Sequence, residues 1–377
     1  MNIMTSRERV KLTINHKQPD RVPIDIGSTA GNFTNNTFFK IKKHLGITSE
    51  DKDILFRPDE SSGYYSDVLL EELGGDFRHV FLLPPDNHNY RIEGSDCIIS
   101  EWGLKKREVN GLMQIINSPL SNAQVDDIDK YNWPDPSDKG RVRGLRKRAK
   151  FLYQNTEYAV ASRAVSHGFF ELAMELRGME NFLMDMCINK KFANKLLEKT
   201  LEIQIKLYEV LLKEAGQYIH IVETADDYGT QSGPIMSPKL FREMIKSRRV
   251  ELNKFIKEMA PGVKIFHHTC GSVYKLIGDL IDTGIDILNP VQPLARDMDS
   301  YRLKKEFGDR LCFHGGIDEQ RAIPGPKDIL EQEIRERIEA FSPGGGYIIA
   351  PTSNFQDDTP IENILFFMKA AKKYGRY

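Results

Sequence analysis

The sequence contains little cysteine, with four residues in a chain of 377. So few thiols in so long a chain exclude the disulfide scaffold of small secreted proteins and favour a reducing environment. The first ten residues are polar and contain no apolar region of the kind found in signal peptides. We therefore expect a cytoplasmic protein.

A long apolar run and an excess of charge of one sign are also missing. No stretch approaches the ~20 apolar residues that a helix needs to span a bilayer, which argues against a membrane protein. The 53 basic and 54 acidic residues give a formal net charge of -1. This balance gives no electrostatic reason to expect nucleic acid or an anionic membrane as a partner, and it is compatible with a homodimer.

An alternation of strand and helix patterns begins near residue 158 and continues toward the end of the chain. Alternating strands and helices imply a parallel sheet, and roughly eight such units close into a TIM (β/α)8 barrel. A doubly wound open sheet is the alternative, but the segment Gly27-Ser-Thr-Ala-Gly-Asn lacks the glycine-rich fingerprint expected after its first strand. The expected strands cover residues 22–26, 158–163, 218–223, 263–268, 285–288, 310–314 and 346–350.

Additions surround this expected barrel, and we treat residues 1–377 as one barrel domain. Thr5 or Ser6 is a plausible cap for a helix in an N-terminal extension. Residues from about 28 to 140 are irregular in pattern and form an expected insertion region. Within it, residues 97–116 indicate inserted short strands in a hairpin-like arrangement.

A histidine and a cysteine stand at the end of the expected strand 263–268. Strand side chains alternate between faces, so His268 and Cys270 share one side. Together they can bind one soft or borderline ion such as zinc, and Gly271 lets the chain turn away sharply. The alternative is a packed thiol beside a hydrogen-bonded imidazole. We take His268 and Cys270 as the candidate metal ligands.

Carboxylates cluster at the end of another expected strand. Alternation places Glu223 near the inner face, and Asp226 and Asp227 project from the loop that follows. Such a cluster suits cation binding or proton transfer, because repulsion and burial raise one pKa; the alternative is loop capping. We predict that Asp226 and Asp227 are catalytic and that Glu223 and Gln231 contact substrate.

Later strand ends complete the predicted rim of the barrel. Asn289 and Gln292 offer directional amide donors and acceptors for a polar substrate, with bonding within the loop as the alternative. His314 could be a third metal ligand or a general base, and we count it as catalytic. Ser353 follows the last strand. We predict substrate contacts for Asn289, Gln292 and Ser353.

A series of short motifs runs in order along nearly the whole chain. The motifs are Thr5-Ser-Arg-Glu-Arg-Val, Pro19-Asp-Arg-Val-Pro23, Asn132-Trp-Pro-Asp-Pro136, Asp226-Asp-Tyr-Gly-Thr-Gln231, Ser237-Pro-Lys-Leu-Phe-Arg242, His268-Thr-Cys-Gly271, Leu288-Asn-Pro-Val-Gln-Pro293, Phe313-His-Gly-Gly-Ile-Asp318 and Asp358-Thr-Pro-Ile-Glu-Asn363. Together they resemble the uroporphyrinogen decarboxylase superfamily. The resemblance implies a TIM barrel with its active site at the carboxyl ends of the strands.

The resemblance implies one of two main activities. The first is decarboxylation of uroporphyrinogen III without a cofactor. True decarboxylases carry an Arg-Gln-Ala-Gly-Arg-Tyr motif after the first strand, and its arginines bind the carboxylates of the substrate. The equivalent segment here, Gly27-Ser-Thr-Ala-Gly-Asn-Phe33, has no arginine. Because buried carboxylates without counter-charges are costly, this departure argues against haem synthesis.

The second activity is methyl transfer between a corrinoid protein and an acceptor such as coenzyme M, with a zinc ion that activates the thiol. His268 and Cys270 match the His-x-Cys pair of these methyltransferases. A further family cysteine, near a Ser-Pro-Gly-Cys motif, corresponds to Ser353 in this sequence, and a hydroxyl is a poor zinc ligand beside a thiolate. The zinc site would then be completed by Glu223, Asp227 or His314.

We therefore predict a methyltransferase of corrinoid-linked one-carbon metabolism, which moves a methyl group between a small molecule and a separate cobalamin protein. Zinc, or an acid such as Asp226 or Asp227, would polarise the bond that breaks. The corrinoid protein would dock over the barrel mouth, because this chain has no Asp-x-His-x-x-Gly motif to supply a cobalt ligand. The alternatives are a carboxy-lyase of porphyrin biosynthesis and a non-catalytic barrel that binds a tetrapyrrole or corrinoid. The many acid, base and ligand groups at one rim are more than a simple binding protein needs.

Overall fold

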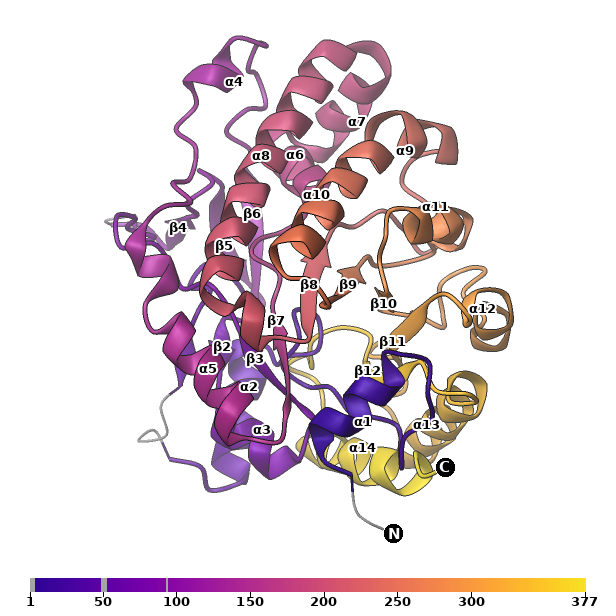
Figure 1. The fold of residues 1–377 in the computed structure, drawn as a ribbon. Helices are drawn as coiled ribbons and strands as arrows, with labels where there is room; N and C mark the ends of the chain where they lie inside the picture. Colours follow the sequence, from indigo (N-terminus) through magenta and orange to yellow (C-terminus); the bar gives the residue numbers. More distant parts are fainter. Residues whose placement is uncertain (1–3, 49–52, 93) are drawn as a thin grey trace.

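A curled parallel sheet forms the centre of the computed structural model, which describes residues 4–48, 53–92 and 94–377 (Figure 1). Within these ranges the sheet has seven strands, in the order β12–β11–β10–β9–β8–β7–β3. Every neighbouring pair is parallel. In chain order the strands are β3 (Phe77–Val80), β7 (Ala159–Ser162), β8 (Ile221–Ala225), β9 (Lys264–His268), β10 (Ile287–Asn289), β11 (Cys312–Ile317) and β12 (Tyr347–Pro351).

A short extended segment lies between the two edge strands of this sheet. Ile24 pairs in parallel with Ile349 of β12, and the N–H of Asp25 donates to the Ile349 carbonyl at 3.1 Å. On the other side, the N–H of Asp76, directly before β3, donates to the Ile24 carbonyl at 2.9 Å. The segment thus takes the eighth position of a TIM-barrel-like fold. The strand predicted at 22–26 is present in this reduced form.

The inward side chains of the barrel divide into an apolar layer and a polar layer. Helix α1 (Ser6–Thr13) begins with a capping box between Thr5 and Glu8, as predicted for the N-terminal helix, and places Val10 and Ile14 against the apolar layer. The strand residues of the apolar layer are Phe77, Ala159, Ala161, Ile221, Phe266, Ile287, Cys312 and Ile348. Two residues further along five of these strands, toward their carboxyl ends, stand His79, Glu223, His268, Asn289 and His314. Alternation therefore places these five polar side chains inside the barrel, one layer above the apolar one.

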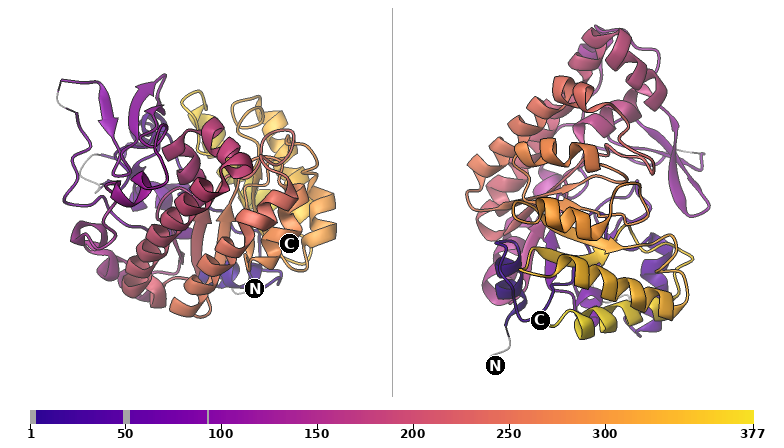
Figure 2. Two further views of the ribbon diagram at one scale, coloured as in Figure 1. Left: turned by 90° about the horizontal axis from the view of Figure 1, so that it is seen from above. Right: turned by 90° about the vertical axis from the view of Figure 1, so that its right-hand side faces the viewer.

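Helices cover the outside of the sheet, and the larger apolar core lies between the two (Figure 2). The segments between the strands contain α5 (Leu145–Asn155) before β7 and two helices packed together, one before and one after β8. The helices that follow β7 are α6 (Phe169–Arg177), α7 (Met179–Ile188), α8 (Lys190–Ala215), α9 (Pro238–Met244), α10 (Lys246–Met259), α11 (Ile277–Asp282), α12 (Ser300–Phe307), α13 (Lys327–Phe341) and α14 (Ile361–Tyr374).

The region predicted as irregular, from about 28 to 140, contains both added elements and one strand of the barrel. The added elements include an antiparallel sheet β4–β5–β6, which confirms the predicted inserted strands and lies to one side of the barrel (Figure 2). The barrel strand is β3, which the sequence analysis missed. The added elements are α2 (Asn35–His44), β1 (Ile54–Leu55), β2 (Tyr64–Tyr65), α3 (Asp67–Leu73), β4 (Cys97–Ile99), β5 (Lys105–Val109), β6 (Leu112–Asn117) and α4 (Asp127–Lys130).

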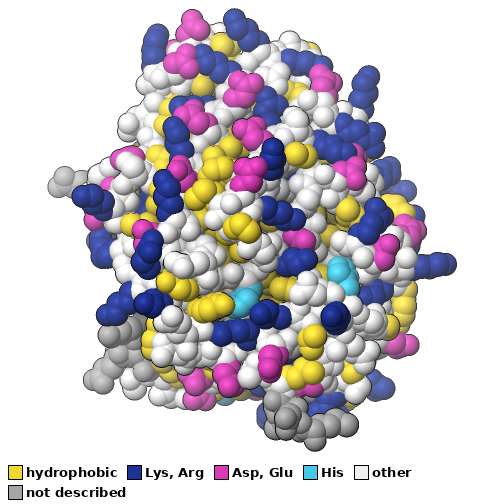
Figure 3. Space-filling model, viewed as in Figure 1, with side chains coloured by type: hydrophobic (Ala, Val, Ile, Leu, Met, Phe, Trp, Pro, Cys, Tyr) yellow, Lys and Arg dark blue, Asp and Glu magenta, His cyan; other side chains and the backbone are white. Residues whose placement is uncertain are grey.

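Opposite charges are mixed over the face of the molecule seen in Figure 3. Lysine and arginine side chains alternate there with aspartate and glutamate, which agrees with the balanced composition. In the part of the chain that the structure describes, no helix combines the length and the apolar character needed to cross a membrane.

Candidate active site

Three side chains meet at the carboxyl end of β9, and we call them the rim triad: Asp227, His268 and Cys270. The thiol of Cys270 lies 3.3 Å from Nε2 of His268, and Oδ1 of Asp227 lies 3.6 Å from the same nitrogen. The same carboxylate oxygen accepts the backbone N–H of Cys270 at 2.8 Å. The structure thus brings the two predicted metal ligands together with Asp227, one of the three residues considered for completing the site.

A chain of hydrogen bonds runs from His268 into the barrel. Nδ1 of His268 lies 2.6 Å from Oδ1 of Asn289, Nδ2 of Asn289 lies 2.8 Å from Nδ1 of His314, and Nε2 of His314 lies 3.0 Å from Oδ2 of Asp25. An ionised carboxylate only accepts, so Nε2 of His314 carries the proton and its Nδ1 accepts from the amide. The amide oxygen then accepts from Nδ1–H of His268. This direction leaves the lone pair of His268 on Nε2, the nitrogen that faces the rest of the rim triad.

Negative charge and burial govern the thiol of the rim triad. Burial, followed by the charges of Asp227, Glu171 and Glu319, raises the pKa of Cys270 well above its usual range. Burial also raises the pKa of Glu319 to about 7. The thiol therefore stays protonated at neutral pH unless a cation offsets the surrounding carboxylates.

The donor atoms of the rim triad fit a zinc ion. An imidazole nitrogen with its lone pair directed at the site, a thiol and a carboxylate form a ligand set that zinc accepts. Donors bound tetrahedrally to one zinc ion stand about 3.3–3.6 Å apart, and the measured S–N and N–O separations are 3.3 and 3.6 Å. Three protein ligands would leave a fourth position for a substrate atom.

Asp226 does not join the rim triad. Its side chain is fully buried and contacts Nη2 of Arg249 at 2.5 Å and the hydroxyl of Tyr228 at 3.0 Å. It also accepts the N–H groups of Phe170 and Glu171 at the start of α6. Burial raises the pKa of Asp226 and Arg249 opposes that effect. These contacts fit a capping role for Asp226, the alternative left open by the sequence, better than they fit the predicted catalytic role.

The predicted substrate-contacting residues lie in different parts of the structure. Gln292 is nearly buried and accepts the N–H of Gly271 at 2.6 Å, which holds the turn after the rim triad. Gln231 is exposed. Ser353 lines a separate hollow beyond the end of β12. Asn289 belongs to the hydrogen-bond chain described above.

A second cluster, which we call the interior triad, consists of Asp25, His79 and Glu223. All three side chains are buried. The N–H of Thr29 donates to Oε2 of Glu223 at 2.8 Å, and the Thr29 hydroxyl bonds to the same oxygen. Burial alone would raise the pKa of Asp25, but His79 and His314 outweigh it and hold that pKa well below its usual range. Asp25 is therefore ionised inside the barrel, where it lies one hydrogen bond away from His314.

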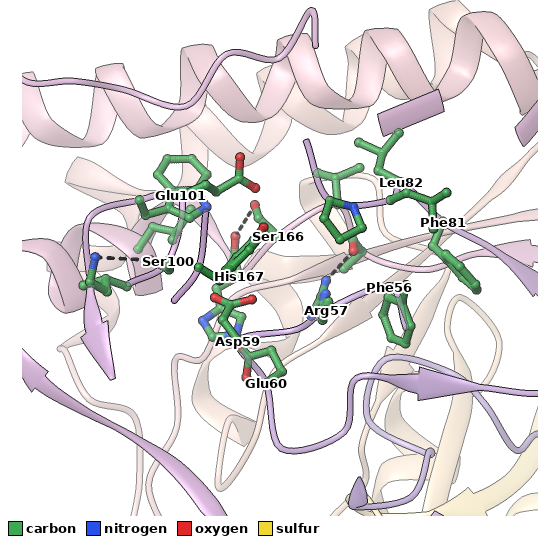
Figure 4. A pocket seen from close by; sticks show the side chains of 18 of the residues that line it. Phe56, Arg57, Asp59, Glu60, Phe81, Leu82, Ser100, Glu101, Ser166 and His167 are labelled. Atoms are coloured by element: carbon green, nitrogen blue, oxygen red, sulfur yellow. Dashed lines mark hydrogen bonds and ion pairs between the residues drawn. The ribbon is translucent and has the colours of Figure 1, made fainter. Parts of the chain in front are cut away.

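A pocket lies beside the barrel, between the added elements and the residues that follow β7 (Figure 4). Aromatic side chains, among them Phe56 and Phe81, form part of its wall. Arg57 enters the pocket and donates to the carbonyl of Ala164 at 2.6 Å. The sequence gives no sign of this pocket, because much of its wall comes from loops of the irregular region.

His167 and two glutamates of α6 form a third polar cluster beside this pocket. Nδ1 of His167 lies 2.9 Å from Glu175 and 3.9 Å from Glu171. Burial alone would lower the pKa of His167, but the neighbouring carboxylates raise it well above its usual range. The spacing of 167, 171 and 175 is a helical signal that could have been found in the sequence.

Replacing Asn289 by alanine should weaken metal binding at the rim triad by about 10–100-fold, the usual effect of removing a residue that orients a ligating histidine. The variant should still fold, because the change removes only the side chain that bridges His268 and His314. Competition with a zinc chelator measures the affinity. An unchanged affinity in a folded variant would mean that the hydrogen-bond chain does not orient His268.

The fold is TIM-barrel-like, and polar side chains gather at the carboxyl ends of its strands. A family model described as "Uroporphyrinogen decarboxylase (URO-D)" matches residues 110–374, well over half of the sequence, and the chain belongs to this family. A curated uroporphyrinogen decarboxylase from Chlorobium phaeobacteroides is 26% identical over 230 residues, which are 59% of this chain and 61% of that protein. The chain thus matches less than two thirds of the length of this relative.

A solved structure of a methyltransferase from Methanosarcina mazei has a similar fold. It superposes with a TM-score of 0.65 at 18% sequence identity and covers 98% of this chain and 99% of its own. This similarity supports the TIM-barrel-like architecture over the whole chain. The predicted superfamily is confirmed.

Proposed function

We propose that this protein is a methyltransferase that moves a methyl group between a small molecule and the cobalamin of a separate corrinoid protein. The observation that supports this function most is the rim triad. An imidazole lone pair, a thiol and a carboxylate meet within 3.3–3.6 Å at the carboxyl ends of the strands, where TIM barrels carry out their chemistry.

The residues of the rim triad would hold a zinc ion, and their neighbours would fix their positions. His268 would bind through Nε2, because its other nitrogen donates to Asn289. Cys270 would bind as a thiolate after losing its proton, and Asp227 already holds the backbone of Cys270. When bound, the metal supplies a Lewis acid that lowers the pKa of the heteroatom from which the methyl group leaves or to which it is added.

His314 acts in this proposal as a positioning residue. Its side chain is 1% exposed, and both ring nitrogens have partners, Asn289 and Asp25. A histidine with both nitrogens engaged and no open face is poorly placed to exchange a proton with substrate. We therefore assign His314 the role of positioning His268, in place of the predicted catalytic role.

The reaction class balances without an external oxidant. A methylated small molecule R–X–CH3 gives its methyl group to cobalt(I) of the corrinoid, X keeps the bonding electron pair and takes a proton, and methylcobalt(III) forms. The reverse direction methylates an acceptor and returns cobalt(I).

Methylcobalamin provides a direct assay for this function. The purified protein is incubated anaerobically with methylcobalamin and a panel of thiol, amine and phenol acceptors, and with cob(I)alamin and the corresponding methylated compounds. We expect protein-dependent interconversion of the two cobalamin spectra with one member of the panel. Release of carbon dioxide from uroporphyrinogen III, together with no change in either cobalamin spectrum, would contradict the proposal and favour the decarboxylase alternative.

A further inference from the structure

The interior triad contains polar atoms that face one another without hydrogen-bond partners. Within the described residues, Oδ1 of Asp25 and both ring nitrogens of His79 have no partner, although all three atoms are buried. The His79 side chain is 0% exposed, and those of Asp25 and Glu223 are 3% and 1% exposed. Buried polar groups are almost always hydrogen-bonded, so this arrangement needs a ligand or another physical reason.

The spacing of these atoms suits an ion better than it suits hydrogen bonds. Nε2 of His79 lies 3.5 Å from Oδ1 of Asp25 and 3.5 Å from Oε1 of Glu223. An N–H donor needs an acceptor at about 2.7–3.2 Å. Donors bound tetrahedrally to one ion at about 2.0–2.2 Å stand about 3.3–3.6 Å apart. Both measured separations fall in the second range.

The neighbouring groups leave this position open to an ion. The second oxygen of each carboxylate is already engaged, Oδ2 of Asp25 by His314 and Oε2 of Glu223 by Thr29, so one oxygen of each remains for the interior triad. The buried guanidinium of Arg163 donates to the carbonyls of Ser28 and Thr29 at 2.8 and 3.3 Å. Its charge lies near Glu223, but it makes no hydrogen bond to either carboxylate in the described structure.

We propose that Asp25, His79 and Glu223 bind a divalent first-row transition ion, such as Zn²⁺, Mn²⁺ or Fe²⁺, at a second site inside the barrel. One imidazole and two carboxylates suit these ions, whereas Ca²⁺ and Mg²⁺ prefer oxygen ligands alone. The site is distinct from the rim triad, because it has no sulfur ligand and its residues come from the segment around Ile24, β3 and β8. The two sites share only the hydrogen-bond chain that begins at Asp25.

This second ion would also act on the rim. It would fix Asp25, which anchors the chain through His314 and Asn289 to His268. The inference does not depend on the proposed methyl transfer, because an ion at the interior triad could support the barrel whatever reaction takes place above it.

Cobalt(II) titration tests the proposal, because cobalt bound to a thiolate gives a charge-transfer absorption that cobalt bound only to nitrogen and oxygen lacks. The metal-free protein should bind two equivalents of Co²⁺, one of them with the thiolate band. His79→Gln should bind one equivalent and keep the band. Cys270→Ala should bind one equivalent without it. His44→Gln, at an exposed histidine of α2, is the matched control and should behave as the wild type.

Circular dichroism and thermal unfolding check that each variant is folded, and Glu223→Gln provides a second removal of a ligand if His79→Gln fails to fold. The proposal is overturned if the wild type binds one equivalent that Cys270→Ala loses and His79→Gln or Glu223→Gln retains. The proposal is upheld if the wild type binds one equivalent of cobalt that gives no thiolate band and His79→Gln loses that equivalent. This holds even if the rim triad binds no cobalt. The failure of the rim site and the failure of the interior site therefore give different results.

Discussion

Replacing Arg249 by methionine is expected to lower the free energy of unfolding by about 3–5 kcal/mol, the usual cost of leaving a buried charge without its partner. Arg249 and Asp226 are both 0% exposed and lie 2.5 Å apart. Arg249 also contacts the hydroxyl of Tyr228 at 3.0 Å and lies 4.8 Å from the centre of the Phe169 ring. Without the guanidinium, the buried Asp226 carboxylate would keep neutral donors alone to offset its charge, or would have to take up a proton.

Urea unfolding followed by circular dichroism measures this effect. Lys254→Met is a suitable control, because Lys254 forms an exposed ion pair with Glu258 on the same helix, and exposed pairs contribute about 0–1 kcal/mol. If Arg249→Met unfolds at the same urea concentration as the control, the buried pair does not have the stabilising role described here.

Asp226→Asn separates the structural role of this residue from the predicted catalytic one. The amide keeps one oxygen for the N–H of Glu171 at the start of α6 and removes the ionisable group. We expect a folded, less stable protein that retains methyl transfer at a temperature well below its unfolding transition. Loss of activity in a variant that remains folded and binds zinc normally would restore Asp226 to the catalytic group.

Cys270→Ala is expected to lower the rate of methyl transfer by about 10³-fold. Metal activation of a reacting group contributes several kcal/mol, and each 1.4 kcal/mol corresponds to about tenfold in rate. Cys270 lies 3.3 Å from the free nitrogen of His268, so its loss removes one of three ligands and the negative charge that the thiolate would supply. The methylcobalamin assay measures the rate.

Cys187→Ala is the matched control for this loss. Cys187 is an exposed free cysteine on α7, and its replacement should leave the rate unchanged. An equal loss in both variants would indicate a general sensitivity to cysteine replacement. Full activity in Cys270→Ala would contradict a role for the rim triad in the reaction.

The sequence was most informative where a residue's position depends on local alternation. Strand β9 ends at His268, and the two-residue spacing alone predicted that Cys270 would lie on the same side; the two side chains are 3.3 Å apart. The same reasoning placed Glu223 inside the barrel, and the structure buries it there. The TIM-barrel-like fold followed from the repeated strand and helix patterns in the same way.

Contacts between residues far apart in the sequence could not be predicted from local alternation. The environment of Asp226 depends on Arg249, which reaches it from α10 across 23 residues of sequence. His79 was missed because β3 has four residues and lies in a region of turns, where a short strand gives too little pattern to recognise. The choice of Asp227 over Glu223 and His314 beside the candidate zinc ligands required their distances in space.

The zinc content of the protein as purified, measured by mass spectrometry in the wild type and in Cys270→Ala, tests the central claim most directly. We predict that the variant contains one zinc equivalent per chain less than the wild type, while both remain folded. Equal zinc content in the two proteins, or zinc in neither, would contradict a metal site at Asp227, His268 and Cys270.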